Sequence, residues 1–193
     1  SSDLVLRERV LVFDGAMGTQ IQSANLTLDD FAGQEGCNEI LVETRPEVIA
    51  AIHERYFAAG ADVVETNSFG GQPYVLGEYD MAHRSFELNS MAAQVARKVA
   101  DRFSTPQRPR FVAGSMGPGT KLVTLGHIGT DELFDAYKVY AKGLIAGGVD
   151  CLNIETCQDI LQVKLAVLAS RDAMAELGRE VPIFCTVTIE TTG

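Results

Sequence analysis

Small, acidic and amide residues follow directly after apolar runs at five places in the sequence. These segments are Asp14-Gly15-Ala16-Met17-Gly18, Glu65-Thr66-Asn67, Gly114-Ser115-Met116-Gly117, Glu155-Thr156 and Glu190-Thr191. Backbone N–H groups in a glycine turn bind a carboxylate, and side-chain carboxylates bind an ammonium group. If the five segments meet in one place, they predict a pocket that binds an amino acid.

The glycine turn at 14–18 does not match the two common phosphate-binding fingerprints. One requires G-x-G-x-x-G and the other G-x-x-x-x-G-K-[ST], whereas Gly15 and Gly18 are three residues apart and no lysine follows them. Glycine and alanine allow a ligand to approach the backbone closely, because no larger side chain intervenes. A single turn of this kind is typical of an ordinary loop, but its repetition after successive strands favours a binding site.

Apolar runs and helical patterns alternate along the chain. We expect strands at 10–14, 62–66, 111–115, 151–155 and 183–189, and helices at 44–60, 84–103, 130–145 and 159–177. Thr44 and Glu47 have the spacing of a capping box for the first helix, and Thr130 is expected to cap the third. Glycines are expected to end the helices, at Gly60, Gly147-Gly148 and Gly178.

The alternation predicts an α/β fold with a parallel sheet. Two related segments, AAGADVVET at 58–66 and AGGVDCLNIET at 146–156, each join a helix end to a strand that closes on Glu-Thr. Polar residues after every strand favour a TIM-type (β/α)8 barrel over a doubly wound open sheet, whose ligands lie beside one switch point. The chain supplies about the first five strands and four helices, whereas closure requires eight units in roughly 250 residues. We therefore expect one domain, 1–193, that is the N-terminal part of a barrel and is incomplete at its C-terminus.

An incomplete barrel leaves inward-facing side chains without the wall that would cover them. We expect this inward set to include Val10, Val12, Val63, Ile154 and Val187. Open strand edges and uncovered apolar faces pair with other segments or chains.

Composition excludes several classes of function. A net charge of -10 and a pI near 4.7 argue against nucleic-acid binding and against anionic membrane surfaces, because both require a clustered basic face. The sequence has no apolar stretch long enough to span a membrane, and its charged start lacks the apolar core of a signal peptide. We expect a cytoplasmic protein.

The cysteines and histidines show no metal-binding spacing. No C-x-x-C or H-x-x-x-H pattern occurs among Cys37, Cys151, Cys157, Cys185, His53, His83 and His127. Cys151 and Cys185 lie in apolar runs and are expected to be small buried hydrophobes. Cys157 follows Glu155 closely and is the one cysteine placed near the predicted pocket. The histidines are expected to be solvated.

Four segments closely resemble the homocysteine-binding module of cobalamin-dependent methionine synthases, in the homocysteine S-methyltransferase family. They are FDGAMGTQIQ, GCNEILVETRPEVIAAIHERYFAAGADVVETNSFGG, FVAGSMGPGT and IETCQD. The similarity spans nearly the whole chain, and the second segment is too long for a chance motif. The resemblance implies a TIM-type barrel and a methyltransferase, with methyl transfer from methylcobalamin to the homocysteine thiolate to give methionine.

The resemblance also implies roles for particular residues. Asp14 and Glu155 would hold the amino group of homocysteine. Its carboxylate would lie against the backbone of Gly15, Ala16 and Met17, and the same pocket would be lined by Thr66 and Asn67. No catalytic side chain is assigned.

Zinc is the metal that the resemblance implies, held by three cysteines on the sixth and later strands. No cysteine of this sequence lies in the matching Asn-Cys or Cys-Cys contexts, so the zinc ligands are expected beyond Gly193. Methylcobalamin is expected on a separate domain, and the partners are folate-binding and cobalamin-binding domains of the same longer polypeptide. Two alternatives are open: a homocysteine methyltransferase that uses betaine or S-methylmethionine, and an amino-acid-binding fragment without catalysis.

Overall fold

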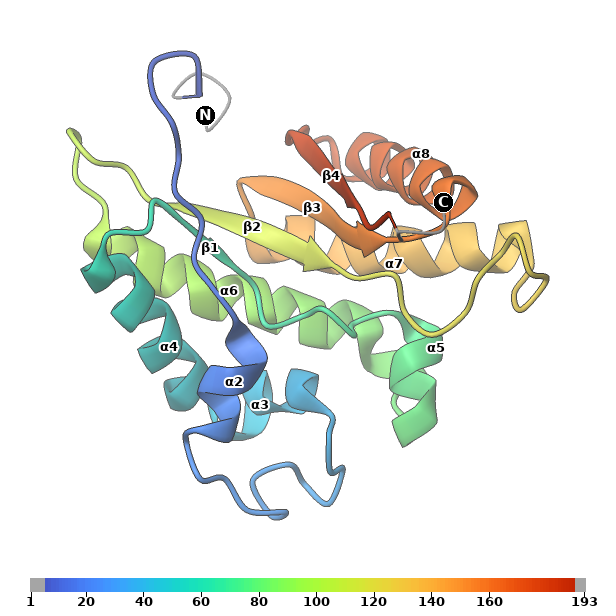
Figure 1. Cartoon of the computed structure of the whole chain (residues 1–193), viewed down its shortest axis with the longest axis horizontal. Helices are drawn as coiled ribbons and strands as arrows, with labels where there is room; N and C mark the ends of the chain where they lie inside the picture. The colour runs from blue at the N-terminus through green and yellow to red at the C-terminus, as the bar shows by residue number, and fades with distance from the viewer. Residues whose placement is uncertain (1–5, 190–193) are drawn as a thin grey trace.

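The computed structural model describes residues 6–189 as a parallel sheet with helices along it (Figure 1). The sheet order is β1 (Val63–Glu65), β2 (Phe111–Met116), β3 (Cys151–Cys157) and β4 (Ile183–Val187). The α-helices are α2 (Met17–Gln22), α3 (Leu41–Thr44), α4 (Pro46–Ala59), α5 (Pro73–Leu76), α6 (Ser85–Phe103), α7 (Thr130–Gly147) and α8 (Ile160–Leu177). Short 3-10 turns are η1 (Asn38–Ile40), η2 (Gly77–Tyr79) and η3 (Ala82–Arg84).

The parallel strands and the intervening helices confirm the α/β prediction. Neighbouring strands are consecutive in the sequence, and helices α4, α6, α7 and α8 pack against one another in the same order. This is the arrangement that repeated βα units produce. Within residues 6–189 the sheet has four strands and is open at β1 and β4. None of the helices in this part of the chain is long and apolar enough to cross a bilayer.

The predicted strand at 10–14 is wrong. This segment runs beside β1 but makes a single parallel bridge, between Phe13 and Val63. Asp14 N–H donates to the Val63 carbonyl at 2.9 Å, and Val12 accepts from the Val63 N–H at 3.1 Å. Val10 and Val12 are 82% and 55% exposed, because their outer side has no strand or helix against it among the described residues.

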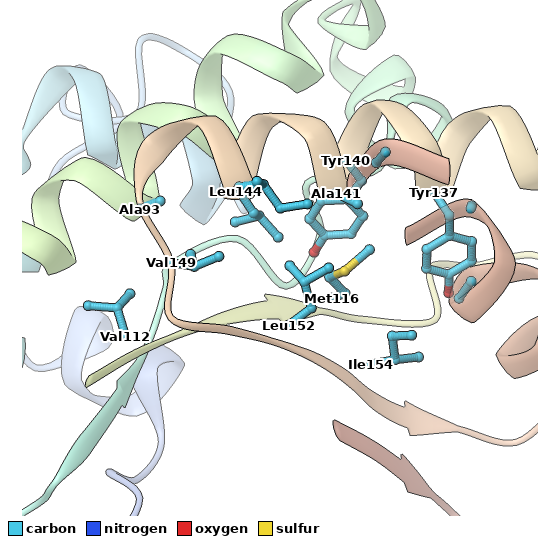
Figure 2. Packing of buried hydrophobic residues seen from close by; sticks show 14 of the residues in the cluster. Ala93, Val112, Met116, Tyr137, Tyr140, Ala141, Leu144, Val149, Leu152 and Ile154 are labelled. Carbon is cyan, nitrogen blue, oxygen red and sulfur yellow. The ribbon is translucent and has the colours of Figure 1, made fainter. Parts of the chain in front are cut away.

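Alternate residues of the strands face opposite sides of the sheet, and the apolar set faces the helices. Figure 2 shows Val112, Met116, Leu152 and Ile154 pointing toward α7, where Leu144 and Tyr140 lie. The expectation that Ile154 faces inward together with Val63 is therefore wrong, because the two side chains lie on opposite faces of the sheet. The face away from the helices carries a smaller apolar cluster of Val63, Phe111, Ala113 and Cys151.

The predicted helix ends are more accurate than the predicted helix starts. Gly60, Gly148 and Gly178 all adopt positive φ at helix C-termini, as expected. The capping box is wrong: α4 begins at Pro46, whose fixed φ suits a first helical position, and Thr44 donates instead to the Asp30 carbonyl at 2.6 Å.

The starts of α7 and α8 also differ from each other in their caps. Thr130 is the first residue of α7 rather than its cap, because Gly129 precedes it with extended backbone. Asp159 caps α8 and accepts from the N–H groups of Leu161 and Gln162. A side-chain oxygen at this position satisfies backbone donors that have no partner within the helix.

A β-bulge near the end of β3 decides which face Glu155 and Cys157 occupy. The register with β4 shifts between Ile154 and Cys157, and Thr156 has a φ of 59°. A bulge turns the following side chain to the other face. Cys157 is therefore fully buried in the cluster beneath the helices and does not face the predicted pocket.

Two further expectations about buried and exposed residues are wrong. Cys185 is exposed, because β4 is an open edge strand in the described part of the chain. His53 is fully buried in α4 rather than solvated. Burial lowers the pKa of this imidazole to about 4, so His53 is neutral at pH 7. Cys151 is buried, as predicted.

Candidate functional site

A cavity of about 450 Å³ lies at the carboxyl ends of the strands. The structure places all seven predicted binding residues around it: Asp14, Gly15, Ala16, Met17, Thr66, Asn67 and Glu155. Seven more residues complete its lining, namely Gly18, Asn38, Glu39, Glu65, Ser68, Phe69 and Ser115. Parallel strands bring their carboxyl ends to one edge of a sheet, so segments far apart in the sequence meet here.

The glycine turn forms one wall of the cavity. Helix α2 begins at Met17, and Ala16 before it has extended backbone and no side-chain oxygen to accept from the first N–H groups of the helix. The Ala16 carbonyl accepts from the Tyr56 hydroxyl of α4 at 2.9 Å. A Cβ on Gly15 would lie 3.1 Å from that hydroxyl oxygen. Glycine at this position therefore lets the tyrosine support the turn from behind.

Two glutamates reach the cavity from the sheet face opposite the helices. Strand alternation places Glu65 on β1 and Glu155 on β3 on this face, together with Ser115 and Asn153. The Ser115 hydroxyl donates to Glu155 Oε1 at 2.5 Å. The Asn153 side-chain amide donates to Glu65 Oε1 at 2.5 Å. Each carboxylate is thus held by one neutral donor, Glu155 by a residue of the neighbouring strand β2 and Glu65 by a residue two strands away on β3.

Asp14 is the third acid of the cavity, and its two carboxylate oxygens both accept from the Glu65 N–H at 3.1 Å. Burial raises the pKa of Asp14 to about 8; the Glu65 N–H opposes this shift, and the charges of Glu65 and Glu155 add to it. Burial also raises the pKa of Glu65 and of Glu155. The cavity therefore disfavours a full set of negative charges, and a bound cation would relieve that cost.

The hydroxyl of Thr66 forms hydrogen bonds that hold the site together. It accepts from the Ser115 N–H at 3.0 Å and lies 2.6 Å from the Ser68 hydroxyl, which in turn bonds the Ser115 carbonyl at 2.8 Å. Asn67 is buried and donates to the Asn38 carbonyl at 2.8 Å. These bonds fix the loop after β1 against β2 and against the loop before α3.

Five polar residues at the cavity were absent from the predicted set, namely Asn38, Glu39, Glu65, Ser68 and Ser115. Glu65 and Ser115 belonged to the strand-end segments, and their position on the same face as Glu155 was the signal that would have selected them. Glu39 lies in the turn η1, before α3. No strand precedes this turn, so a search for polar residues after strands does not select it. Its carboxylate accepts from the Gly70 N–H at 2.7 Å, and burial raises its pKa. Only the folded chain brings this loop to the strand ends.

The donor set does not suit zinc. Within residues 6–189, no group of three or more His, Cys, Asp or Glu side chains is placed to hold a metal ion. The four cysteines are separate free thiols, and three of them are buried. Structural and catalytic zinc sites use at least three protein ligands that converge on one point. The described residues that line the cavity are acids, amides, hydroxyls, Phe69 and the backbone turn at 14–18, and they include no cysteine or histidine.

Comparison with known protein families assigns the chain to a family. A sequence model of the homocysteine S-methyltransferase family matches residues 11–193. The chain belongs to the homocysteine S-methyltransferase family.

Two curated relatives are methionine synthases. That of Mycobacterium tuberculosis is 58% identical over 98% of this chain, and that of Mycobacterium leprae is 57% identical over 97% of it. The chain spans 16% of the length of each. Among solved structures, the metallated form of the homocysteine methyltransferase MmuM from Escherichia coli matches with a TM-score of 0.73 at 22% identity. The match covers 94% of this chain and 64% of that one, and it shows a shared fold.

Proposed function

We propose that this chain is the homocysteine-binding part of a methionine synthase, in which a methyl group passes from methylcobalamin to the homocysteine thiolate. The observation that carries the proposal is the pairing, in one cavity, of a backbone turn at 15–17 with half-buried acids. An α-amino acid presents a carboxylate and an ammonium at a fixed separation, and these two walls are complementary to them. The 57–58% identical methionine synthases support the choice of amino acid.

The proposed binding mode gives each predicted residue a role. Asp14 and Glu155 accept hydrogen bonds from the ammonium group, and their raised pKa values reflect a cavity prepared for a cation. The carboxylate lies against the backbone N–H groups of Gly15, Ala16 and Met17, while the cavity wall beside the ligand consists of Thr66 and Asn67. This chain's contribution is to bind and orient homocysteine, and no residue here is assigned to the methyl transfer itself.

The proposal includes a larger assembly. We propose that residues 1–193 are part of a (β/α)8 barrel domain, and that folate-binding and cobalamin-binding domains lie on the same longer polypeptide. Zinc would activate the thiol by stabilising its thiolate. Its ligands would lie outside the described residues, which offer no such set. We also propose a cytoplasmic location, where the free thiols of this chain would stay reduced.

Homocysteine binding and methyl-donor choice test the proposal. In the complete polypeptide that carries this sequence, titration calorimetry should detect binding of homocysteine. It should detect no binding of homocysteine amide, which lacks the carboxylate. Single-turnover assays with methylcobalamin should yield methionine, whereas betaine and S-methylmethionine should yield none. Turnover with betaine or S-methylmethionine alone would favour the second class of homocysteine methyltransferase. Absence of homocysteine binding would reject the proposal.

A further inference from the structure

We propose that Glu65 is a third carboxylate ligand of the substrate ammonium group, beside Asp14 and Glu155, and that Asn153 positions it. This inference rests on the proposed function. It adds a binding residue on β1 and a positioning residue on β3, neither of which was among the predicted binding residues.

The first support is the path that the Glu65 side chain follows across the sheet. Glu65 lies on β1, yet its Oε1 accepts from the Asn153 amide on β3, so the side chain passes over β2. The residue of β2 in register with Glu65 is Ala113, whose small side chain leaves this path free. Asn153 is only 6% exposed and therefore holds a fixed orientation. The glutamate is thus directed along the floor of the cavity instead of outward into solvent.

The second support is the number of hydrogen-bond acceptors. Among the described residues, no group donates to the other Glu65 oxygen, Oε2, or to Glu155 Oε2. An ammonium group carries three N–H donors, so three carboxylates at one cavity match it in number as well as in charge. Asp14 is fixed by the backbone N–H of Glu65 itself, which places the two acids side by side.

The third support is the absence of any compensating cation. Four acids line the cavity, Asp14, Glu39, Glu65 and Glu155, and its lining within residues 6–189 includes no lysine, arginine or histidine. Glu39 has a separate task, because it accepts from the Gly70 N–H. For the other three acids the ammonium group of the ligand would supply the positive charge, since uncompensated charge in a half-buried site is costly.

The test compares two ligands that differ only in the ammonium group. Homocysteine and 4-mercaptobutanoate share the thiol and the carboxylate, and calorimetry on the complete polypeptide gives both affinities. Glu65→Gln keeps an oxygen that can accept a hydrogen bond from Asn153. It should lower the affinity for homocysteine roughly tenfold or more, which is the usual loss for a charge-assisted hydrogen bond. The same variant should leave the affinity for 4-mercaptobutanoate unchanged.

Further variants separate binding from structure. Asn153→Ala should weaken homocysteine selectively but less than Glu65→Gln, because the carboxylate stays and only its orientation is lost. Glu180→Gln removes an exposed charge between α8 and β4, outside the cavity lining, and should change neither affinity. Equal losses for both ligands in Glu65→Gln, or no loss for either, would overturn the proposal. If Asp14→Asn still shows the selective loss, the proposed function stands and only the role of Glu65 fails.

Discussion

Asp62 and Glu65 are three residues apart along the chain, at opposite ends of β1, and they have opposite electrostatic surroundings. Asp62 is buried with Arg9 at 2.8 Å and Arg110 at 3.4 Å, and it also accepts from the Val12 N–H. Burial alone would raise its pKa, but Arg9, the Val12 N–H and the charge of Arg108 lower it. Glu65 has one neutral donor, Asn153, and burial raises its pKa.

The difference separates a structural acid from a ligand-binding acid. At the amino end of β1, the protein supplies its own cations, and the carboxylate ties the N-terminal segment and the loop before β2 to the sheet. At the carboxyl end, the acids share a cavity and no cation is supplied by the residues that line it within 6–189. A buried charge requires a partner, so the missing partner at this end indicates what the ligand must carry.

The largest expected effect is on the structural side. Asp62→Ala leaves the buried Arg110 guanidinium without its acid and should lower the free energy of unfolding by about 3–5 kcal/mol, the usual cost of removing one partner from a buried pair. Urea unfolding of wild type and variant measures it. A loss below about 1 kcal/mol would mean that Asp62 contributes no more to the free energy of unfolding than an exposed acid does.

The acids of the cavity should behave in the opposite way. Asp14→Asn and Glu155→Gln should weaken homocysteine binding by about 1.5–3 kcal/mol each, since each removes a charged acceptor from a partly dry site. Their stability without ligand should be unchanged or higher, because like charges are removed. Calorimetry and urea unfolding on the same samples give both values. Unchanged affinity in both variants would remove these acids from the binding site.

The pH dependence of stability should also have opposite signs at the two ends. The pKa of Asp14 rises from 3.8 to about 8 on folding. The folded chain therefore binds the extra proton between these values, and Asp14 makes stability fall as pH rises through that window, by at most about 1.4 kcal/mol per pH unit. Asp14→Asn should remove this slope.

Asp62 provides the counterpart to Asp14. Its pKa is lowered on folding, so its contribution is present above pH 3.8 and is lost as pH falls through the folded value. Unfolding curves from pH 4 to 8 in wild type and Asp14→Asn measure the first effect. Identical slopes would show that Asp14 does not hold a proton in the empty cavity. Homocysteine affinity should rise with pH up to about 8, because binding requires the ionised carboxylate.

The smallest effect should come from an exposed ion pair. Glu54 on α4 bonds Arg102 on α6, and their side chains are 40% and 60% exposed. Glu54→Gln should cost between 0 and about 1 kcal/mol, because water screens the pair. Added salt should reduce even that cost. A loss as large as that of Asp62→Ala would mean that burial does not distinguish these acids.

Local sequence was sufficient to predict the features that depend on neighbouring residues alone. The three glycine helix ends were predictable because only a residue without a Cβ adopts positive φ at low cost. The α/β class followed from alternating strand and helix patterns, and the convergence of 14–17, 66–67 and Glu155 followed from the geometry of parallel strand ends. Helix starts were less predictable, since Thr44 found a better partner in the Asp30 carbonyl than in its own helix.

Tertiary structure decided everything that depends on which face a side chain occupies. The bulge at Thr156 sends Cys157 beneath the helices while Glu155 stays at the cavity, and no periodicity in the sequence marks that shift. The loop that carries Glu39 reaches the strand ends only through the packing of the preceding turns against α6. The types of chemical group at the site and their order along the chain can be read from the amino-acid sequence alone. Their mutual distances were decided by strand register and by helix packing, because these forces act between residues that are far apart in sequence.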